Sequence, residues 1–310
     1  MSKGKLRVIY TTIICVGLIM LILWMFFKMS VGSEKLVNQK EISVILYYSG
    51  KDGWESLQEG MKQAEDDFSV NINYVVMRED ADGDEQIAAV EKEIENGAEG
   101  ILIAVCDYEK FNIAMQELKF KVPIVTIESG LDSDLYPIIT ADNYEMGRRL
   151  GEEILKDFPE EEELTVVVEQ ENLNRDSVRQ RREGLDDALE GKAQIISIGE
   201  LIGFQKPDVA VGLHKDSLVK LLDMKDKILK DVKIYGIGNT ASIVAALDQG
   251  KMEKLVFQNE FNVGYLGVER LLSDINNVKY VENSKIDYYC VSRQELYGTQ
   301  YEQLLFPIVE

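Results

Sequence analysis

The feature that most constrains the fold is a regular alternation of short apolar runs with amphipathic helical stretches, from about residue 41 onward. The runs are nearly all apolar instead of alternating with polar residues, which is typical of parallel strands buried on both faces. The alternation therefore predicts an open, doubly wound α/β architecture. The predicted strands are 43–48, 71–76, 100–105, 123–127, 136–141, 164–169, 193–199, 208–213, 232–238, 254–258 and 286–291.

These strands fall into two similar series, which indicates two lobes. A chain of 310 residues with 45% hydrophobic residues is long enough to fill two modest cores. No Gly/Ser tract separates the series, and Pro totals only five. We therefore expect no flexible tether between the lobes.

A separate apolar segment precedes the first strand. Residues 8–27 contain no charged side chain, and a helix of this length matches the thickness of a bilayer core. Lys3, Lys5 and Arg7 precede it, so the positive-inside rule predicts a cytoplasmic N-terminus and an extracellular or periplasmic domain. The alternative is a cleaved signal peptide ending near residues 30–32. The apolar segment is longer than the usual core of a signal peptide, which favours a membrane anchor.

Composition argues against several functional classes. Asp and Glu number 55 against 34 Lys and Arg, so the surface repels phosphate backbones and nucleic acid is not expected as a partner. One histidine and two cysteines outside the anchor, Cys106 and Cys290, cannot furnish a tetrahedral metal site. The two thiols are predicted to be buried and free, and a disulfide between them is the alternative. The segment 236–241 lacks the third glycine of a dinucleotide-binding fingerprint. We expect no enzyme, no cofactor and no metal.

Two predicted helices begin with a similar sequence. YEMGRRLGEEIL (144–155) and FNVGYLGVERLL (261–272) each place an aromatic residue three positions before a glycine and a second glycine about one turn later. Asn143 and Asn259 stand where helix caps or hinge residues would lie. Glycines on one face of a helix let backbones approach closely. Taken singly, each copy is also explained by ordinary packing of a helix on a sheet.

The order of elements, the first helix start and the segment 234–272 together resemble a known family. The chain is similar, over about residues 42–310, to the type I periplasmic solute-binding proteins of the sugar-binding branch. That branch includes ribose- and galactose-binding proteins and shares its fold with the ligand domain of lac-repressor-type regulators. The resemblance implies two doubly wound parallel-sheet lobes joined by a three-strand hinge, after an N-terminal transmembrane helix. The repeated helix starts would then mark hinge crossings.

The resemblance also implies domain boundaries. Residues 1–40 would form a cytoplasmic tail, anchor and linker. One lobe would comprise 41–142 with 259–285, and the other 143–258 with 286–310.

Four residues of this chain match positions that contact the ligand in the family. Trp54 would stack on the apolar face of a sugar ring, and Glu128 would accept hydrogen bonds from hydroxyl groups. Arg181, the second arginine of Arg179-Gln180-Arg181, would donate two hydrogen bonds. Gln258 would reach the ligand from the hinge.

Two positions depart from the family pattern. His214 stands where an asparagine is common, and Gly238 followed by Asn239 stands where an aspartate is common. His214 could contact a hydroxylated ligand or cap the next helix. The missing acid argues against a simple pentose or hexose.

The resemblance implies a membrane-anchored binding protein that captures a small, neutral, hydroxylated, sugar-like ligand by hinge closure. Two roles fit: delivery of the ligand to an ABC importer, or presentation of the closed form to a membrane sensor such as a histidine kinase. A DNA-binding regulator of the same fold is not expected, because an apolar segment replaces the DNA-binding helices and the charge has the wrong sign.

Overall fold

The computed structural model divides the chain into Met1–Lys40 and a compact unit, Glu41–Glu310, which holds the strands and the helices α2 to α9. Among the described residues, no helix combines the length and the hydrophobicity needed to cross a bilayer. The predicted span 8–27 lies for the most part outside the described residues. The structure describes residues 17–21, 24, 39–50, 52–118, 120–131, 136–159, 164–169, 172–201, 206–280, 285–298, 301, 304 and 305.

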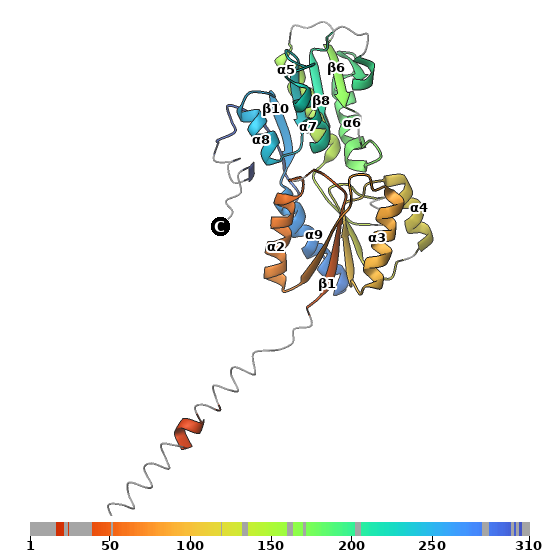
Figure 1. Cartoon of the computed structure of the whole chain (residues 1–310), viewed down its shortest axis with the longest axis vertical. Coiled ribbons are helices and arrows are strands. Elements are labelled where there is room, and N and C mark those ends of the chain that lie inside the picture. Colours follow the sequence, from red (N-terminus) through yellow and green to blue (C-terminus); the bar gives the residue numbers. More distant parts are fainter. Residues whose placement is uncertain are drawn as a thin grey trace, which may run out of the picture. The chain divides into compact units, whose positions relative to one another are not determined.

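The strands of the compact unit form two sheets, one in each lobe (Figure 1). The sheet of the first lobe is parallel throughout, in the order β2-β1-β3-β4-β5. Its strands are β1 (Glu41–Leu46), β2 (Asn71–Val76), β3 (Gly100–Ile103), β4 (Ile124–Ile127) and β5 (Ile138–Ile139).

Helices cover both faces of this sheet. On one face, Val44 and Leu102 of the sheet share a core with Leu57 of α2 and Leu271 of α9. Ile45 and other residues of alternate parity pack on the opposite face with α3 and α4. The helices are α2 (Glu55–Phe68), α3 (Gly83–Glu95), α4 (Tyr108–Leu118) and α9 (Glu260–Ile275).

The second lobe repeats this plan around a sheet ordered β11-β10-β9-β8-β6-β7. Its strands are β6 (Leu164–Glu169), β7 (Ala193–Ser197), β8 (Val209–Gly212), β9 (Lys233–Ile237), β10 (Lys254–Gln258) and β11 (Tyr288–Ser292). The last strand, β11, pairs antiparallel with β10. The other five strands are mutually parallel, as expected, and β11 adds an antiparallel edge because it enters the sheet from the other lobe and not through a crossover helix of its own.

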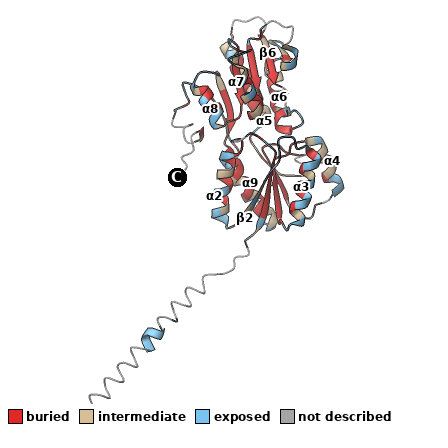
Figure 2. Ribbon diagram, viewed as in Figure 1, coloured by how far each residue is buried: buried red, intermediate tan, exposed pale blue. Residues whose placement is uncertain are grey.

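Alternate side chains of this sheet again face opposite layers of helices. Val166 shares a core with Leu150 of α5 and Leu185 of α6, whereas Val167 faces α7 and α8 through Leu218 and Ile243. Figure 2 shows the same arrangement as buried strands between helices whose outer faces are exposed. The helices are α5 (Asn143–Asp157), α6 (Asp176–Leu189), α7 (Lys215–Met224) and α8 (Ala241–Asp248), with a short 3-10 helix, η1 (Ile198–Leu201).

The repeated glycines bring two helices of the same lobe into backbone contact. A Cβ atom on Gly147 of α5 would lie 1.9 Å from the carbonyl oxygen of Arg181 in α6. Reciprocally, a Cβ atom on Gly184 of α6 would lie 2.0 Å from the carbonyl oxygen of Tyr144 in α5. In each helix, the glycine packs against a backbone carbonyl of the other helix, three residues before that helix's own glycine. A residue larger than glycine would clash at either position.

The first lobe contains the same reciprocal contact between α9 and α2. A Cβ atom on Gly264 would meet the carbonyl oxygen of Leu57 at 2.1 Å, and one on Gly60 would meet that of Phe261 at 2.0 Å. The repeated motif therefore specifies close packing of one helix on another, and not only of a helix on a sheet.

The chain crosses between the lobes three times: from β5 to α5, from β10 to α9, and from α9 to β11. These crossings lie side by side. The Gln258 side-chain oxygen accepts a hydrogen bond from the Ala141 backbone N–H at 2.9 Å, and the Asn259 N–H donates to the Asp287 carbonyl at 3.1 Å. Asn259 caps α9, as expected, whereas α5 is capped by Asp142, so Asn143 is the first helical residue and not the cap.

Candidate functional site

The two lobes meet through side chains that follow the carboxyl ends of the strands, where open α/β sheets bind their ligands. Tyr47 follows β1 and Glu128 follows β4 in the first lobe. Arg181 lies in α6, and His214 follows β8, in the second lobe. All four are buried. These residues form one interlobe hydrogen-bonded cluster.

Glu128 lies at the centre of this cluster. One carboxylate oxygen accepts from the Tyr47 hydroxyl at 2.5 Å and from the Ser177 hydroxyl at 3.3 Å. The other accepts from Arg181 at 2.9 Å, which joins the two lobes by a buried ion pair. Glu128 holds a left-handed φ of 59°, a conformation that costs a non-glycine residue about 1 kcal/mol. These three hydrogen bonds offset that cost.

Arg181 uses each of its guanidinium nitrogens within the protein. Besides Glu128, it donates to the Asn143 side-chain oxygen at 2.8 Å and to the Leu213 carbonyl at 3.1 Å. The predicted pair of ligand-binding groups, Glu128 and Arg181, is thus brought together, but in this structure each is the partner of the other.

The cluster shifts several protonation equilibria. Burial by itself opposes ionisation of Glu128, but the charges of Arg181 and Arg175 and the hydrogen bond from Tyr47 hold the pKa of this carboxyl below its ordinary value. Burial and the neighbouring Glu128 charge raise the pKa of Tyr47 well above its ordinary value. Burial also lowers the pKa of His214, although Asp216 opposes the shift. A neutral histidine, a neutral tyrosine and a carboxylate therefore coexist at neutral pH.

For His214 the sequence left two roles open, a helix cap and a contact in the ligand region. It is the N-cap of α7, where its Nδ1 accepts from the Asp216 N–H. Its Nε2 also lies 3.2 Å from the Tyr47 hydroxyl across the lobe interface. Capping and interlobe contact are thus compatible.

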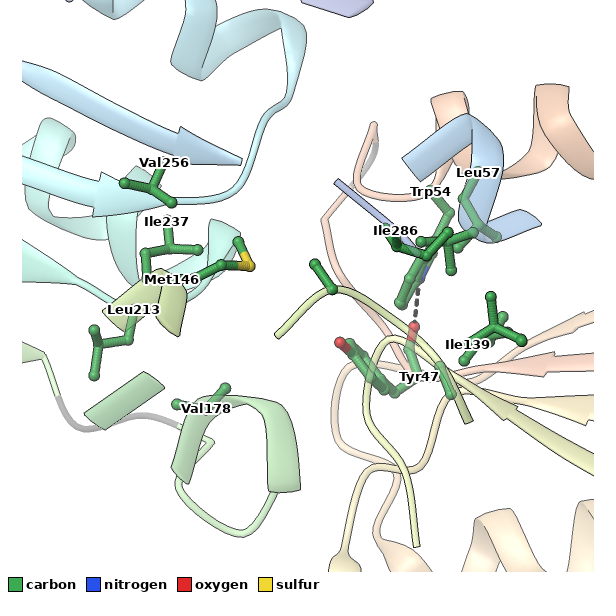
Figure 3. Close-up of a cluster of buried hydrophobic side chains, with 14 of the residues drawn as sticks. Tyr47, Trp54, Leu57, Ile139, Met146, Val178, Leu213, Ile237, Val256 and Ile286 are labelled. Atoms are coloured by element: carbon green, nitrogen blue, oxygen red, sulfur yellow. Dashed lines mark hydrogen bonds between the residues drawn. The ribbon is translucent and has the colours of Figure 1, made fainter. Parts of the chain in front are cut away.

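Trp54 belongs to the same region but is not free to stack on a ligand in this arrangement. Its indole N–H donates to the Tyr47 backbone oxygen at 2.8 Å, as Figure 3 shows, and the two rings meet edge to face at 4.8 Å. The residue is only 5% exposed.

In the described part of the structure, neither of the remaining two predicted residues hydrogen-bonds to a side chain of the Glu128 cluster, although the Thr140 hydroxyl contacts both Gln258 and the Glu128 carbonyl. Gln258 accepts hydrogen bonds from Ala141 and Thr140 in the first crossing, so it ties two crossings together. Asn239 follows β9, and its side-chain oxygen is buried with no partner among the described residues.

Sequence reasoning missed two cations of this region, Arg175 and Lys215. The Arg175 guanidinium carbon lies 3.6 Å from the centre of the Tyr47 ring, covering its face. Lys215 crosses to the first lobe, where it donates to the Gly53 carbonyl and pairs with Glu260 at 2.6 Å. Only their positions in the sequence could have indicated a role in this region, because Lys215 follows His214 after a strand and Arg175 immediately precedes α6.

Lys215 also explains the glycine that replaces the family's aspartate. A Cβ atom on Gly238 would lie 2.6 Å from the Lys215 side chain, and Gly238 has a φ of +115°. The lysine stem therefore occupies the space that an acidic side chain would need.

A cavity of about 640 Å³ lies beside this cluster, between the lobes. None of the six predicted ligand residues is among the described residues that line it. Its lining includes Tyr48, Ser49 and Asp52 of the first lobe and Arg175, Lys215 and Asp216 of the second. The volume suits a small ligand.

Comparisons with known proteins agree with this architecture. The chain is similar to the carbohydrate transporter solute-binding protein of Agrobacterium radiobacter, solved with D-arabinose (TM-score 0.76, 20% identity, 87% of this chain and 99% of that one). It is also similar to GanP, a glucose-galactose binding protein of Geobacillus stearothermophilus (TM-score 0.71, 16% identity, 84% and 100%). A third similar chain comes from an XylFII–LytSN complex (TM-score 0.68, 17% identity, 82% and 98%).

These similarities confirm the predicted fold of two α/β lobes. No match to a curated protein was found. The sequence pattern of the family described as periplasmic binding protein domain matches residues 42–212, more than half of the chain. That family comprises binding proteins and not enzymes, in agreement with the expectation that the chain catalyses no reaction. The chain belongs to the periplasmic binding protein domain family.

Proposed function

We propose that this protein is an extracellular solute-binding protein that captures a small, hydroxylated, sugar-like ligand between its lobes and delivers it to an ABC importer. The observation that carries this proposal is the interlobe region itself. Polar and aromatic side chains from both lobes meet there at the ends of the strands, beside a cavity of about 640 Å³. The carbohydrate transporter and glucose-galactose binding proteins of the same fold support a sugar-like ligand.

The lobes of this proposal are residues 41–142 with 259–285 and 143–258 with 286–310. Helix α9 packs on the first sheet and β11 joins the second, which supports this division. The three crossings act as the hinge. Because Glu128 and Arg181 satisfy each other in the closed arrangement, ligand exchange requires the lobes to open.

A thermal-shift screen of residues 41–310 against sugars, polyols and nucleosides tests the binding function. A ligand present at 100 times its dissociation constant stabilises the folded state by about 2.7 kcal/mol. We expect at least one hydroxylated ligand to raise the midpoint of thermal unfolding. If no member of the screen shifts the midpoint, and calorimetry also detects no heat of binding, the proposed function is wrong.

The alternative role is that of a ligand-sensing subunit, which presents its closed form to a membrane sensor such as a histidine kinase. The likeness to a chain of the XylFII–LytSN complex favours this alternative. Gene neighbours separate the two roles: permease genes beside this gene support import, and genes for a sensor kinase and its response regulator support sensing.

Membrane anchoring through residues 8–27 is part of the same proposal. It is supported by the uncharged segment and the basic residues before it. Protease treatment of intact cells should remove the lobes and leave a short membrane-bound fragment. Protection of the lobes would contradict the topology, and release of a soluble protein beginning near Ser33 would show a cleaved signal peptide instead.

A further inference from the structure

Two residues that line the cavity between the lobes each have a buried polar atom without a hydrogen-bond partner among the described residues. These atoms are the Ser49 hydroxyl oxygen, in the first lobe, and the Arg175 Nε, in the second. Both residues line the cavity, and they are only 2% and 7% exposed. Buried polar groups in proteins are normally paired, so two covered, unpaired atoms in residues that line one cavity indicate groups that a ligand can serve once the lobes open.

These two atoms define what the inner end of a ligand must offer. The Nε–H of Arg175 can only donate, so it requires an acceptor oxygen. The Ser49 hydroxyl can donate or accept, which suits a hydroxyl group. The aromatic ring of Tyr48, which is 37% exposed and also lines the cavity, offers an apolar surface beside them.

The described cations of the cavity lining have charged partners, whereas several of its carboxylates do not. Each lining cation has a carboxylate partner: Arg175 lies 3.8 Å from Asp216, Lys215 pairs with Glu260 at 2.6 Å, and Lys220 pairs with Glu169 at 3.0 Å.

The carboxylates of Asp52, Glu79 and Asp223 also line the cavity, and no side chain in the described part of the protein pairs with them. All three residues are exposed, so we take them as the outer part of the lining. The unmatched charge of the described lining residues is therefore negative, which favours a cationic group on the ligand and disfavours a phosphate or a carboxylate.

We propose that the cavity binds a hydroxylated molecule that carries a protonated amino group, such as an amino sugar or an amino polyol. Ser49 and Arg175 hold hydroxyl oxygens at the inner end, and Asp52, Glu79 and Asp223, in the outer part of the lining, attract the ammonium group. This inference rests on the proposed function, and it replaces the neutral ligand predicted from sequence by a cationic one. It also places the ligand beside Arg175, and not between Glu128 and Arg181.

Calorimetric titration of the full chain in detergent at low salt tests this inference with matched probes. D-Glucosamine and 6-amino-6-deoxy-D-glucose carry the ammonium group at different ring positions, D-glucose lacks it, and N-acetyl-D-glucosamine carries a neutral substituent. We expect at least one amino sugar to bind about tenfold more tightly than D-glucose, the scale of a few exposed ion pairs. Added salt should reduce this ratio.

Variants assign the contacts. Asp52→Asn and Asp223→Asn should each weaken binding of the amino sugar several-fold more than binding of D-glucose, and Ser49→Ala should weaken both sugars equally. Asp66→Asn, at an exposed position of α2 away from the cavity lining, is the matched control and should change neither.

The outcomes separate the two proposals. Equal affinity for D-glucose and the amino sugars, or affinity for amino sugars that both Asp variants leave unchanged, overturns the cationic ligand but keeps the proposed function. Absence of binding by every probe, together with a negative thermal-shift screen, overturns both.

Discussion

The Glu128–Arg181 ion pair should control the closure of the lobes more than the stability of either lobe. The substitution Glu128→Gln keeps the shape of the side chain but removes its charge, leaving Arg181 buried without a charged partner. Removal of one partner of a buried ion pair costs about 3–5 kcal/mol if the other remains buried. This pair spans the lobe interface, so opening of the lobes returns Arg181 to water and limits the cost.

Even the lower value, about 3 kcal/mol, is sufficient to shift the population of closed molecules strongly. A loss of about 3 kcal/mol from the closed state changes the ratio of open to closed molecules by roughly 150-fold. A protein that is about 99% closed would then become about 40% closed, by the same arithmetic. The free energy of unfolding of each lobe should change little, because Glu128 and Arg181 belong to different lobes.

Pulsed electron-spin measurement of an interlobe distance is the direct assay. Spin labels at Glu117→Cys in α4 and Lys227→Cys after α7 lie at exposed positions of different lobes. Cys106→Ser and Cys290→Ser remove the two free thiols from the soluble fragment 39–310. We expect Glu128→Gln to add a population at a different, open distance.

The control is Glu183→Gln, which removes an exposed partner of Arg179 within α6 and should leave the distance distribution unchanged. If Glu128→Gln leaves the distances unchanged but lowers the midpoint of chemical unfolding, the pair stabilises the fold and not the closed state. If both stay unchanged, the pair contributes nothing and the reasoning is refuted.

The same pair predicts a pH dependence. The pKa of Glu128 is lowered in the closed state, so closure is fully stabilised above the ordinary carboxyl pKa of 4.5 and weakens as pH falls through the lowered value. The interlobe distance of the parent protein should therefore shift towards the open value in acid. A closed population that does not change with pH, in a protein that remains folded, would contradict this assignment.

Three further outcomes follow from other contacts. Gly147→Ala should lower the unfolding free energy by about 1–3 kcal/mol because its Cβ meets a backbone oxygen, whereas Gly199→Ala, in open space, should be nearly neutral in the same denaturant titration. The double variant Lys215→Met/Glu260→Gln should reduce the closed population less than either single variant, as measured by the same interlobe distances. Each single change leaves a buried group unpaired, whereas the double change removes both. The thiol of Cys106, whose pKa burial raises to about 11, should react slowly with a disulfide reagent at pH 8 and rapidly after unfolding; equal rates would contradict its burial.

The sequence predicted most of the fold because parallel strands buried on both faces leave a strong signal. Val166, Val167 and Val168 of β6 illustrate it, since helices of both layers take up the alternate side chains. The antiparallel direction of β11 was not predictable in this way. An edge strand that arrives from the other lobe has no crossover helix of its own, and apolar composition carries no information on direction.

The candidate site was predictable only in part. Glu128 and Arg181 were placed by a resemblance, and the structure brings them together across the lobe interface. Arg175 and Lys215 carry no motif, and their contacts depend on the closed arrangement of two lobes that a linear pattern does not encode. Whether any of the six predicted residues contacts a ligand stays a prediction.

The repeated helix start connects these interlobe contacts to the crossings. The first residue of α5, Asn143, accepts a hydrogen bond from Arg181, and the first residue of α9, Glu260, pairs with Lys215. The glycine contacts hold α5 against α6 and α9 against α2, so each crossing enters a helix that cannot move independently of its own lobe. If the crossings act as the proposed hinge, a rotation at either one moves a whole lobe as a rigid body.

This arrangement explains why the same helix start appears at two crossings. A rigid body that turns at the residue before Asn143 changes the distance between Arg181 and Glu128, because these residues belong to different lobes. A turn before Glu260 changes its contact with Lys215, for the same reason. In the proposed function, a ligand held by Arg175 and Ser49 would bridge the same two lobes, so its binding energy would add to that of the two ion pairs only when the lobes are closed. The rigidity supplied by the glycines thus lets a small contact between the lobes bias the orientation of whole lobes.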